Sequence, residues 1–177
     1  MSPQADDHVT NKRVDPPNLG DEKATLVAFV EYHRQTLLLK CAGLTPEQLI
    51  ARPVSPSSLS LLGLVRHLTE VEFGWLHSRF AGQPDREIYG PGDADLEVSE
   101  ADEESVAAAF ALYAEFVATS QQIVADADLS DVTAAAHPRT GEHFSLRWIL
   151  DHLLEEYARH NGHADLLREA IDGVVGE

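Results

Sequence analysis

The sequence holds a single cysteine, Cys41, so no disulfide can close within the chain. Because Cys41 falls near the end of a predicted helix, we expect a small buried core residue rather than a nucleophile. No apolar run approaches the roughly 18 residues that a membrane-spanning helix needs. The polar N-terminal residues 1–13 lack the apolar segment of a secretory signal. These features predict a cytoplasmic protein.

Basic residues are scarce: Lys and Arg number 13 against 30 Asp and Glu, which gives a net charge of −17. Nucleic acids and anionic membranes both attract basic surfaces, so neither is an expected partner. The length of 177 residues suits one domain with a hydrophobic core of its own.

Familiar catalytic motifs are also absent. The sequence has no glycine-rich phosphate loop, no G-x-S-x-G and no H-E-x-x-H. It also lacks the duplicated Glu-x-x-His of di-iron bundles. Strand-like alternation and internal repeats are missing as well, which favours a helical protein.

Apolar residues recur with helical spacing in four segments, at 21–41, 59–81, 100–127 and 145–173. Connectors at 44–58, 82–98 and 128–144 join them, and the first contains a short helical turn, LTPEQL. Residues 1–20 show no periodicity and predict a flexible N-terminal tail, followed by one domain over 21–177. The expected fold class is all-α: a four-helix bundle whose long connectors permit crossover connections.

Polar residues mark the expected helix ends. Ser58 or Ser60 is placed to cap the second helix, Ser99 the third and Ser145 the last. Gly173 stands where a C-terminal cap glycine is expected.

The last predicted helix carries potential metal ligands beside its apolar stripe. His152, Glu156, His160 and His163 fall within an arc of roughly 80° on the helix. Glu156 and His160 are one turn apart, so both can reach a single ion. On the helical wheel His160 points closest to the bundle axis and Glu156 next, whereas His152 and His163 lean toward the edge.

A metal site in a bundle draws ligands from more than one helix, and His67 is the histidine on the core side of the second helix. The predicted ligand set is His67, Glu156 and His160. His77, near the end of the same helix, is a weaker candidate. His67 can alternatively be a buried, hydrogen-bonded histidine, and Glu156 with His160 a surface pair. His152 and His163 are left open as partners of the ligands, substrate contacts or surface residues.

These residues carry a family resemblance. The segments GLVRHLTEVEFGW (63–75) and SLRWILDHLLEEYARHNGHADLLREAIDG (145–173) together resemble the DinB-like superfamily of metal-binding four-helix proteins, over about residues 22–173. Within it, the sequence is most similar to the branch of mycothiol-dependent isomerases and mycothiol or bacillithiol S-transferases.

The resemblance implies a divalent metal, zinc or nickel, held by one histidine of the second helix and two ligands of the last. His67 and His160 match two of these positions. Glu156 stands where many members carry histidine and where the mycothiol-dependent isomerase carries glutamate, which favours the thiol-dependent branch. His163 stands where glutamine is common, and its part in metal binding stays open.

The function implied first is a metal-dependent S-transferase for detoxification. A low-molecular-weight thiol, mycothiol first, would bind at the metal as thiolate and attack an electrophilic carbon. One alternative is a mycothiol-dependent cis–trans isomerase of a small diacid, for which Arg66, Arg147 and Arg159 flank the motifs. Another is a non-catalytic metal-binding stress protein. A homodimer stays open, and no general acid or base is assigned.

Overall fold

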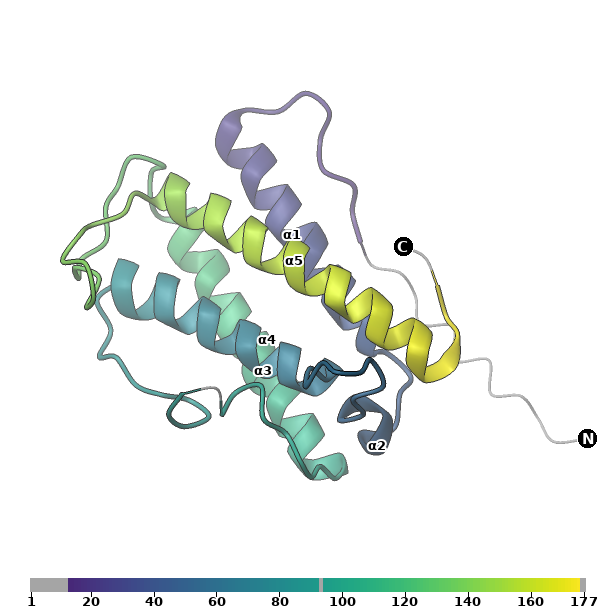
Figure 1. Cartoon of the computed structure of the whole chain (residues 1–177). Coiled ribbons are helices and arrows are strands. Elements are labelled where there is room, and N and C mark those ends of the chain that lie inside the picture. Colours follow the sequence, from purple (N-terminus) through teal and green to yellow (C-terminus); the bar gives the residue numbers. More distant parts are fainter. Residues whose placement is uncertain (1–12, 93, 176–177) are drawn as a thin grey trace, which may run out of the picture.

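The computed structural model describes residues 13–92 and 94–175. Over these residues the chain forms an all-α bundle of DinB-like type, with the elements α1 (Glu22–Cys41), α2 (Pro46–Leu49), α3 (Leu61–Glu72), η1 (Phe73–Phe80), α4 (Glu103–Ala125) and α5 (Leu146–Asp172). Figure 1 shows the four long helices side by side and α2 at one end. Most of the predicted tail lies outside the described residues; residues 13–20 form neither helix nor strand.

The helices do not follow simple up-and-down order. α1 packs on α5, α5 packs on α3, and α3 packs on α4 (Figure 1). Because α5 sits between α1 and α3, the connection from α4 must cross the bundle to reach it. The predicted crossover is therefore confirmed.

Side chains cap the helices where the sequence offers short polar residues. Asp21 accepts a hydrogen bond from the Ala24 amide, Ser60 from Gly63 and Ser145 from Trp148. Gly173 ends α5 in the left-handed region, at φ 79°.

Two helix predictions need correction. The third long helix was predicted over 100–127, but α4 begins only at Glu103. Its cap is Asp102, which forms a reciprocal capping box with Ser105, so Ser99 is not the cap. The predicted second helix is not α-helical throughout, because η1 is a π-helical continuation of α3. Its end is marked by a bond from the Ala81 amide to the Leu76 carbonyl, five residues back, at 2.9 Å. Apolar spacing does not distinguish these two helical registers.

The core consists of two apolar clusters with a polar layer between them. One cluster gathers Leu37, Leu68, Val117 and Ala164 with other buried residues; the second contains Val30, Leu76, Val124 and Leu153. The polar layer falls between the two sets, at Arg34, Glu72 and Ser120, and the hydroxyl of Tyr157, a residue of the first cluster, reaches it. Cys41 is buried in the first cluster, as predicted, and burial raises the pKa of its thiol to about 12.

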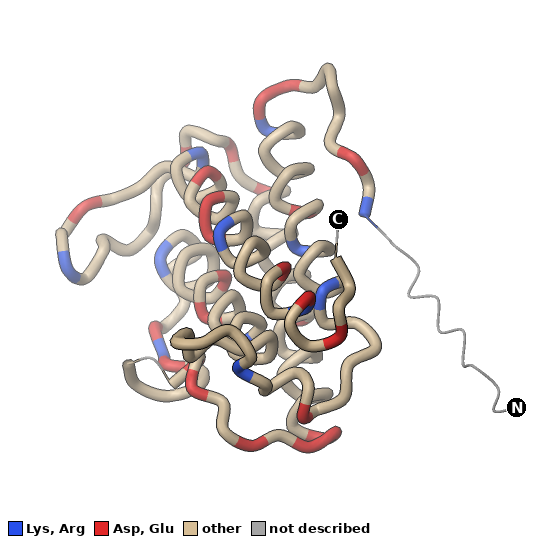
Figure 2. The backbone as a smooth tube through the Cα atoms, turned by 45° about the vertical axis from the view of Figure 1, so that its right-hand side comes forward, with Lys and Arg blue, Asp and Glu red and all other residues tan. Residues whose placement is uncertain are grey.

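The acidic surplus is spread over the outer turns and loops, with fewer basic residues among it (Figure 2). Within the described part of the chain, no helix is long and apolar enough to cross a membrane.

Candidate metal centre

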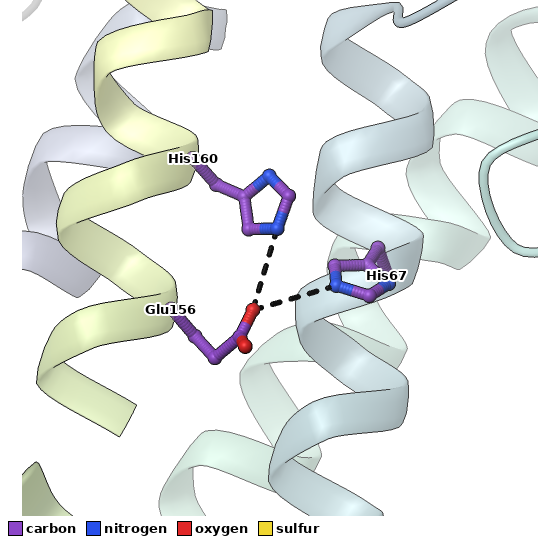
Figure 3. Close-up of side chains that lie close together, drawn as sticks. All are labelled: His67, Glu156 and His160. Carbon is purple, nitrogen blue, oxygen red and sulfur yellow. Dashed lines mark ion pairs between the residues drawn. The ribbon is translucent and has the colours of Figure 1, made fainter. Parts of the chain in front are cut away.

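Three side chains from two facing helices converge between α3 and α5 (Figure 3). The Glu156 Oε2 atom lies 3.4 Å from His160 Nε2 and 3.7 Å from His67 Nε2. One ligand atom from each residue lies within 4.8 Å of the others. These are the three residues of the predicted ligand set, and the described part of the chain contains no other such group.

Helical spacing explains the convergence. Glu156 and His160 are four residues apart on α5, so their side chains project from successive turns of one face. His67 comes from the middle of α3, between the buried residues Leu64 and Leu68, and α3 packs on α5. The side chains of Glu156 and His160 are 15% and 11% exposed, so both are largely enclosed by the bundle but not sealed from solvent.

The spacing fits a shared ion. Two ligand atoms about 2.1 Å from a tetrahedral zinc ion stand about 3.4 Å apart. The distances from Glu156 to the two histidines match this value closely and exceed those of ordinary hydrogen bonds. Two imidazole nitrogens and one carboxylate oxygen are also the donor types that zinc accepts, and nickel shares the preference for imidazole. The residues present therefore fit a divalent metal.

His67 is oriented by a partner that the sequence analysis did not identify. Asp95, in the loop between η1 and α4, lies 2.7 Å from His67 Nδ1. With Nδ1–H donating to this carboxylate, Nε2 keeps its lone pair toward Glu156, an arrangement common among metal-binding histidines. Burial alone would lower the pKa of His67, but the carboxylates of Asp95 and Glu156 outweigh it and raise that pKa. A loop aspartate 28 residues from its partner leaves no periodic signal in the sequence.

His160 has a similar but weaker partner. His163 Nδ1 lies 3.4 Å from His160 Nδ1. If the Nδ1–H group of His160 donates to His163, the lone pair of His160 Nε2 is directed toward Glu156. Burial, followed by the neighbouring His67, lowers the pKa of His160 to about 4, so this imidazole is neutral near pH 7. His163 thus contacts a predicted ligand through the nitrogen that faces away from the centre.

His152 lies at the edge of the centre. Its Nε2 atom is 3.8 Å from Glu156 Oε1, and its ring stacks on Trp148. The side-chain exposure falls from His152 to Glu156 to His160, which is the order that the helical wheel predicts.

The weaker candidates are engaged elsewhere. His77 is buried and bonded to the Phe116 carbonyl and Ser120, away from the centre. Arg66 donates to the Ala94 carbonyl, while Arg147 and Arg159 pair with glutamates on the outer surface.

A fully buried acid lies close by in the core. Glu72 accepts two hydrogen bonds from Arg34, at 2.8 and 2.9 Å, and one from the Tyr157 hydroxyl at 2.8 Å. Tyr113 joins through Tyr157 at 3.0 Å. The sequence analysis did not foresee this network, although an acid and an arginine within apolar stripes are the available signal.

Comparison with known proteins identifies the family of this chain. The sequence matches the family model described as mycothiol-S-transferase over residues 25–173. This chain belongs to the mycothiol S-transferase family, a DinB-like family. The predicted resemblance is therefore confirmed.

The solved structures include a conserved protein from Enterococcus faecalis that shares the fold. Its TM-score is 0.60 at 16% sequence identity, and the match covers 88% of this chain and 100% of that one. The comparison with curated proteins finds no match. Family membership makes this a mycothiol S-transferase-like or DinB-like metal-dependent protein, and it agrees with a metal centre on facing bundle helices.

Proposed function

We propose that this protein is a metal-dependent S-transferase that joins a low-molecular-weight thiol, mycothiol first, to electrophilic carbon atoms in a detoxification role. The observation that carries the proposal is the convergence of His67, Glu156 and His160 in a chain of the mycothiol S-transferase family. The proposed catalytic unit is the single domain formed by residues 21–177.

We assign His67, Glu156 and His160 as ligands of one divalent metal, zinc or nickel. A metal there would act as a Lewis acid that lowers the pKa of a thiol and so supplies thiolate near neutral pH. The protein's own part is to hold two imidazole nitrogens and one carboxylate oxygen in fixed directions. Their combined charge of −1 leaves a divalent site positive overall, which suits an anionic sulfur.

The transfer itself is balanced without a further reactant. The thiol loses its proton to solvent, and a sulfur electron pair forms the new bond to the electrophilic carbon. The bond from that carbon to its leaving group breaks, and the leaving group takes the electron pair. No protein nucleophile is needed, and Cys41, the single cysteine, is buried with a raised pKa.

The diacid isomerase is less well supported. Such a substrate needs cationic contacts, and Arg66, Arg147 and Arg159 are all engaged in bonds away from the centre.

The test is a conjugation assay on protein purified without a histidine tag. Metal content is measured by elemental analysis, and mycothiol, bacillithiol and another cellular thiol are each mixed with a bimane electrophile. We expect one metal per chain and faster conjugation with mycothiol than in the uncatalysed control, lost in His160→Ala. Stoichiometric metal without acceleration by any thiol would favour the non-catalytic alternative. No bound metal after zinc is added back would rule out the centre.

A further inference from the structure

Five aromatic rings gather beside the candidate metal centre. This aromatic cluster consists of Trp75 from η1, His137 and Phe144 from the loop before α5, and Trp148 and His152 from the first turns of α5. Trp75 lies 5.1 Å from Trp148 and 4.9 Å from His152, measured between ring centroids. Trp148 also lies 4.3 Å from Phe144. The sequence contains two tryptophans, and both belong to this cluster.

The cluster is continuous with the metal centre along α5. Trp148, His152, Glu156 and His160 follow one another at four-residue intervals, so they form one ridge on the helix. Trp148 is 41% exposed, and the side chains of the next three are 20%, 15% and 11% exposed in that order. The ridge therefore runs from an exposed aromatic ring to the buried end of the centre, with His152 making the link.

The facing helix runs in the opposite direction and carries a matching pair. His67 lies beside Glu156, and Trp75, eight residues later, lies beside Trp148 and His152. Trp75 stands in the π-helical segment, and π-turns are frequent at functional sites. The Arg79 guanidinium covers the Trp75 ring at 4.7 Å, in space that a side chain on Gly74 would occupy. Trp75 is thus held from several sides, whereas Trp148 is the exposed tryptophan of the cluster.

We propose that the aromatic cluster binds a planar aromatic electrophile by stacking on Trp148 and so delivers its reactive carbon to the thiol at the metal centre. Two features carry this assignment: the exposed Trp148 ring, and the continuous ridge that links this ring through His152 to Glu156 of the centre. Aromatic rings favour offset or edge-to-face contact with other rings over contact with aliphatic groups of similar size. This inference rests on the proposed S-transferase function and specifies its second substrate.

The reaction with such a substrate can be written for chlorodinitrobenzene. The thiol sulfur bonds to the ring carbon that bears chlorine, and the carbon–chlorine bond breaks to release chloride. The proton of the thiol goes to the buffer. Iodoacetamide is the small aliphatic counterpart, which loses iodide in the same way but offers no ring to stack.

The first experiment measures binding without chemistry. Metal-free protein is titrated with dinitrobenzene, which has no leaving group, and tryptophan fluorescence is followed. We expect saturable quenching whose dissociation constant rises on the order of tenfold in Trp148→Leu, with Trp75 as the remaining reporter, and recovers in Trp148→Phe. Leu166→Ala is the matched control, because Leu166 is an exposed apolar residue of the same helix about 27 Å away. Quenching that does not saturate, or that is equal in Trp148→Leu, would overturn the inference.

The second experiment compares the two electrophiles on metal-loaded protein with mycothiol. In Trp148→Leu we expect the KM for chlorodinitrobenzene to rise on the order of tenfold and the rate with iodoacetamide to stay within about twofold. Equal losses with both electrophiles would contradict aromatic selection. Saturable quenching without conjugation of any electrophile would disprove the transferase and leave the aromatic site standing, so the two failures are distinguishable.

Discussion

Two glutamates on facing helices, Glu72 and Glu156, differ in how far the protein itself satisfies them. Glu72 is fully buried, and Arg34 and Tyr157 donate three hydrogen bonds of 2.8 to 2.9 Å to its carboxylate. Glu156 faces histidine nitrogens at 3.4 to 3.8 Å, beyond ordinary hydrogen-bond length. The first carboxylate is part of a completed structural network. The second lies among imidazole nitrogens at a spacing that could hold a cation.

The pKa shifts of the residues around Glu72 and around Glu156 differ as well. The carboxylate of Glu72 outweighs burial and raises the pKa of Arg34 above its usual range, which keeps the guanidinium charged. At the centre, burial lowers the pKa of His160 and keeps this imidazole neutral, the form that binds metals. Variants of Glu72 should therefore change the stability of the fold, whereas variants of Glu156 should change metal binding.

The largest effect on stability is expected for Glu72→Gln. This change leaves the Arg34 charge buried without its partner, and breaking a buried pair in this way costs about 3–5 kcal/mol of unfolding free energy. Urea denaturation measures the loss. Glu22→Gln breaks the exposed pair with Arg147 and serves as the control, for which we expect little change. Equal losses of unfolding free energy in the two variants would show that Glu72 contributes no more to stability than an exposed carboxylate does.

Glu156→Ala should leave the metal-free protein close to wild-type stability, because it removes no normal hydrogen bond from this carboxylate. Zinc at about 100 times its dissociation constant should stabilise the wild type by about 2.7 kcal/mol. Thermal denaturation with and without zinc should show this gain in the wild type and in Glu155→Ala, an exposed neighbour, but not in Glu156→Ala. A zinc response that survives in Glu156→Ala would show that the ligand set is wrong.

Asp95→Asn should weaken metal binding without abolishing it. The substitution removes the charge that orients the His67 ring but none of the three proposed ligands, and such changes typically cost roughly 10–100-fold in affinity. Competition for zinc with a chelating dye gives the ratio. Asp151→Asn, at an exposed position of α5, is the control. Wild-type affinity in Asp95→Asn would mean that its contact with His67 does not support the centre.

The smallest effects are expected at the edge of the centre. His163→Ala should weaken zinc binding less than Asp95→Asn, because a 3.4 Å contact between two imidazole nitrogens is weaker than a 2.7 Å bond to a carboxylate. His152→Ala should keep the metal, since its nearest contact to Glu156 is 3.8 Å. The same dye competition measures both. Loss of metal in His152→Ala together with retention in Glu156→Ala would reverse the assignment of ligand and neighbour.

The sequence by itself determined the features that depend on spacing along one chain segment. Apolar periodicity predicts the four long helices, and Ser145 and Gly173 mark the ends of α5 because capping is a local interaction. The four-residue spacing places Glu156 and His160 on one face, and the wheel gives their order of burial. The choice of His67 as their partner needed one further assumption, that bundle helices bring core-side histidines together.

Only the tertiary structure decided the features that join distant segments. The contact of Asp95 with His67 depends on the path of a loop, and the bond from Arg34 to Glu72 on the register of two helices. The π-register of η1 arises within a segment whose apolar spacing is equally compatible with an α-helix, so the position of Trp75 beside Trp148 was not predictable. Side-chain types and local spacing limit which chemistry is available, whereas packing decides which acid the protein satisfies with its own hydrogen bonds and which lies among histidine nitrogens.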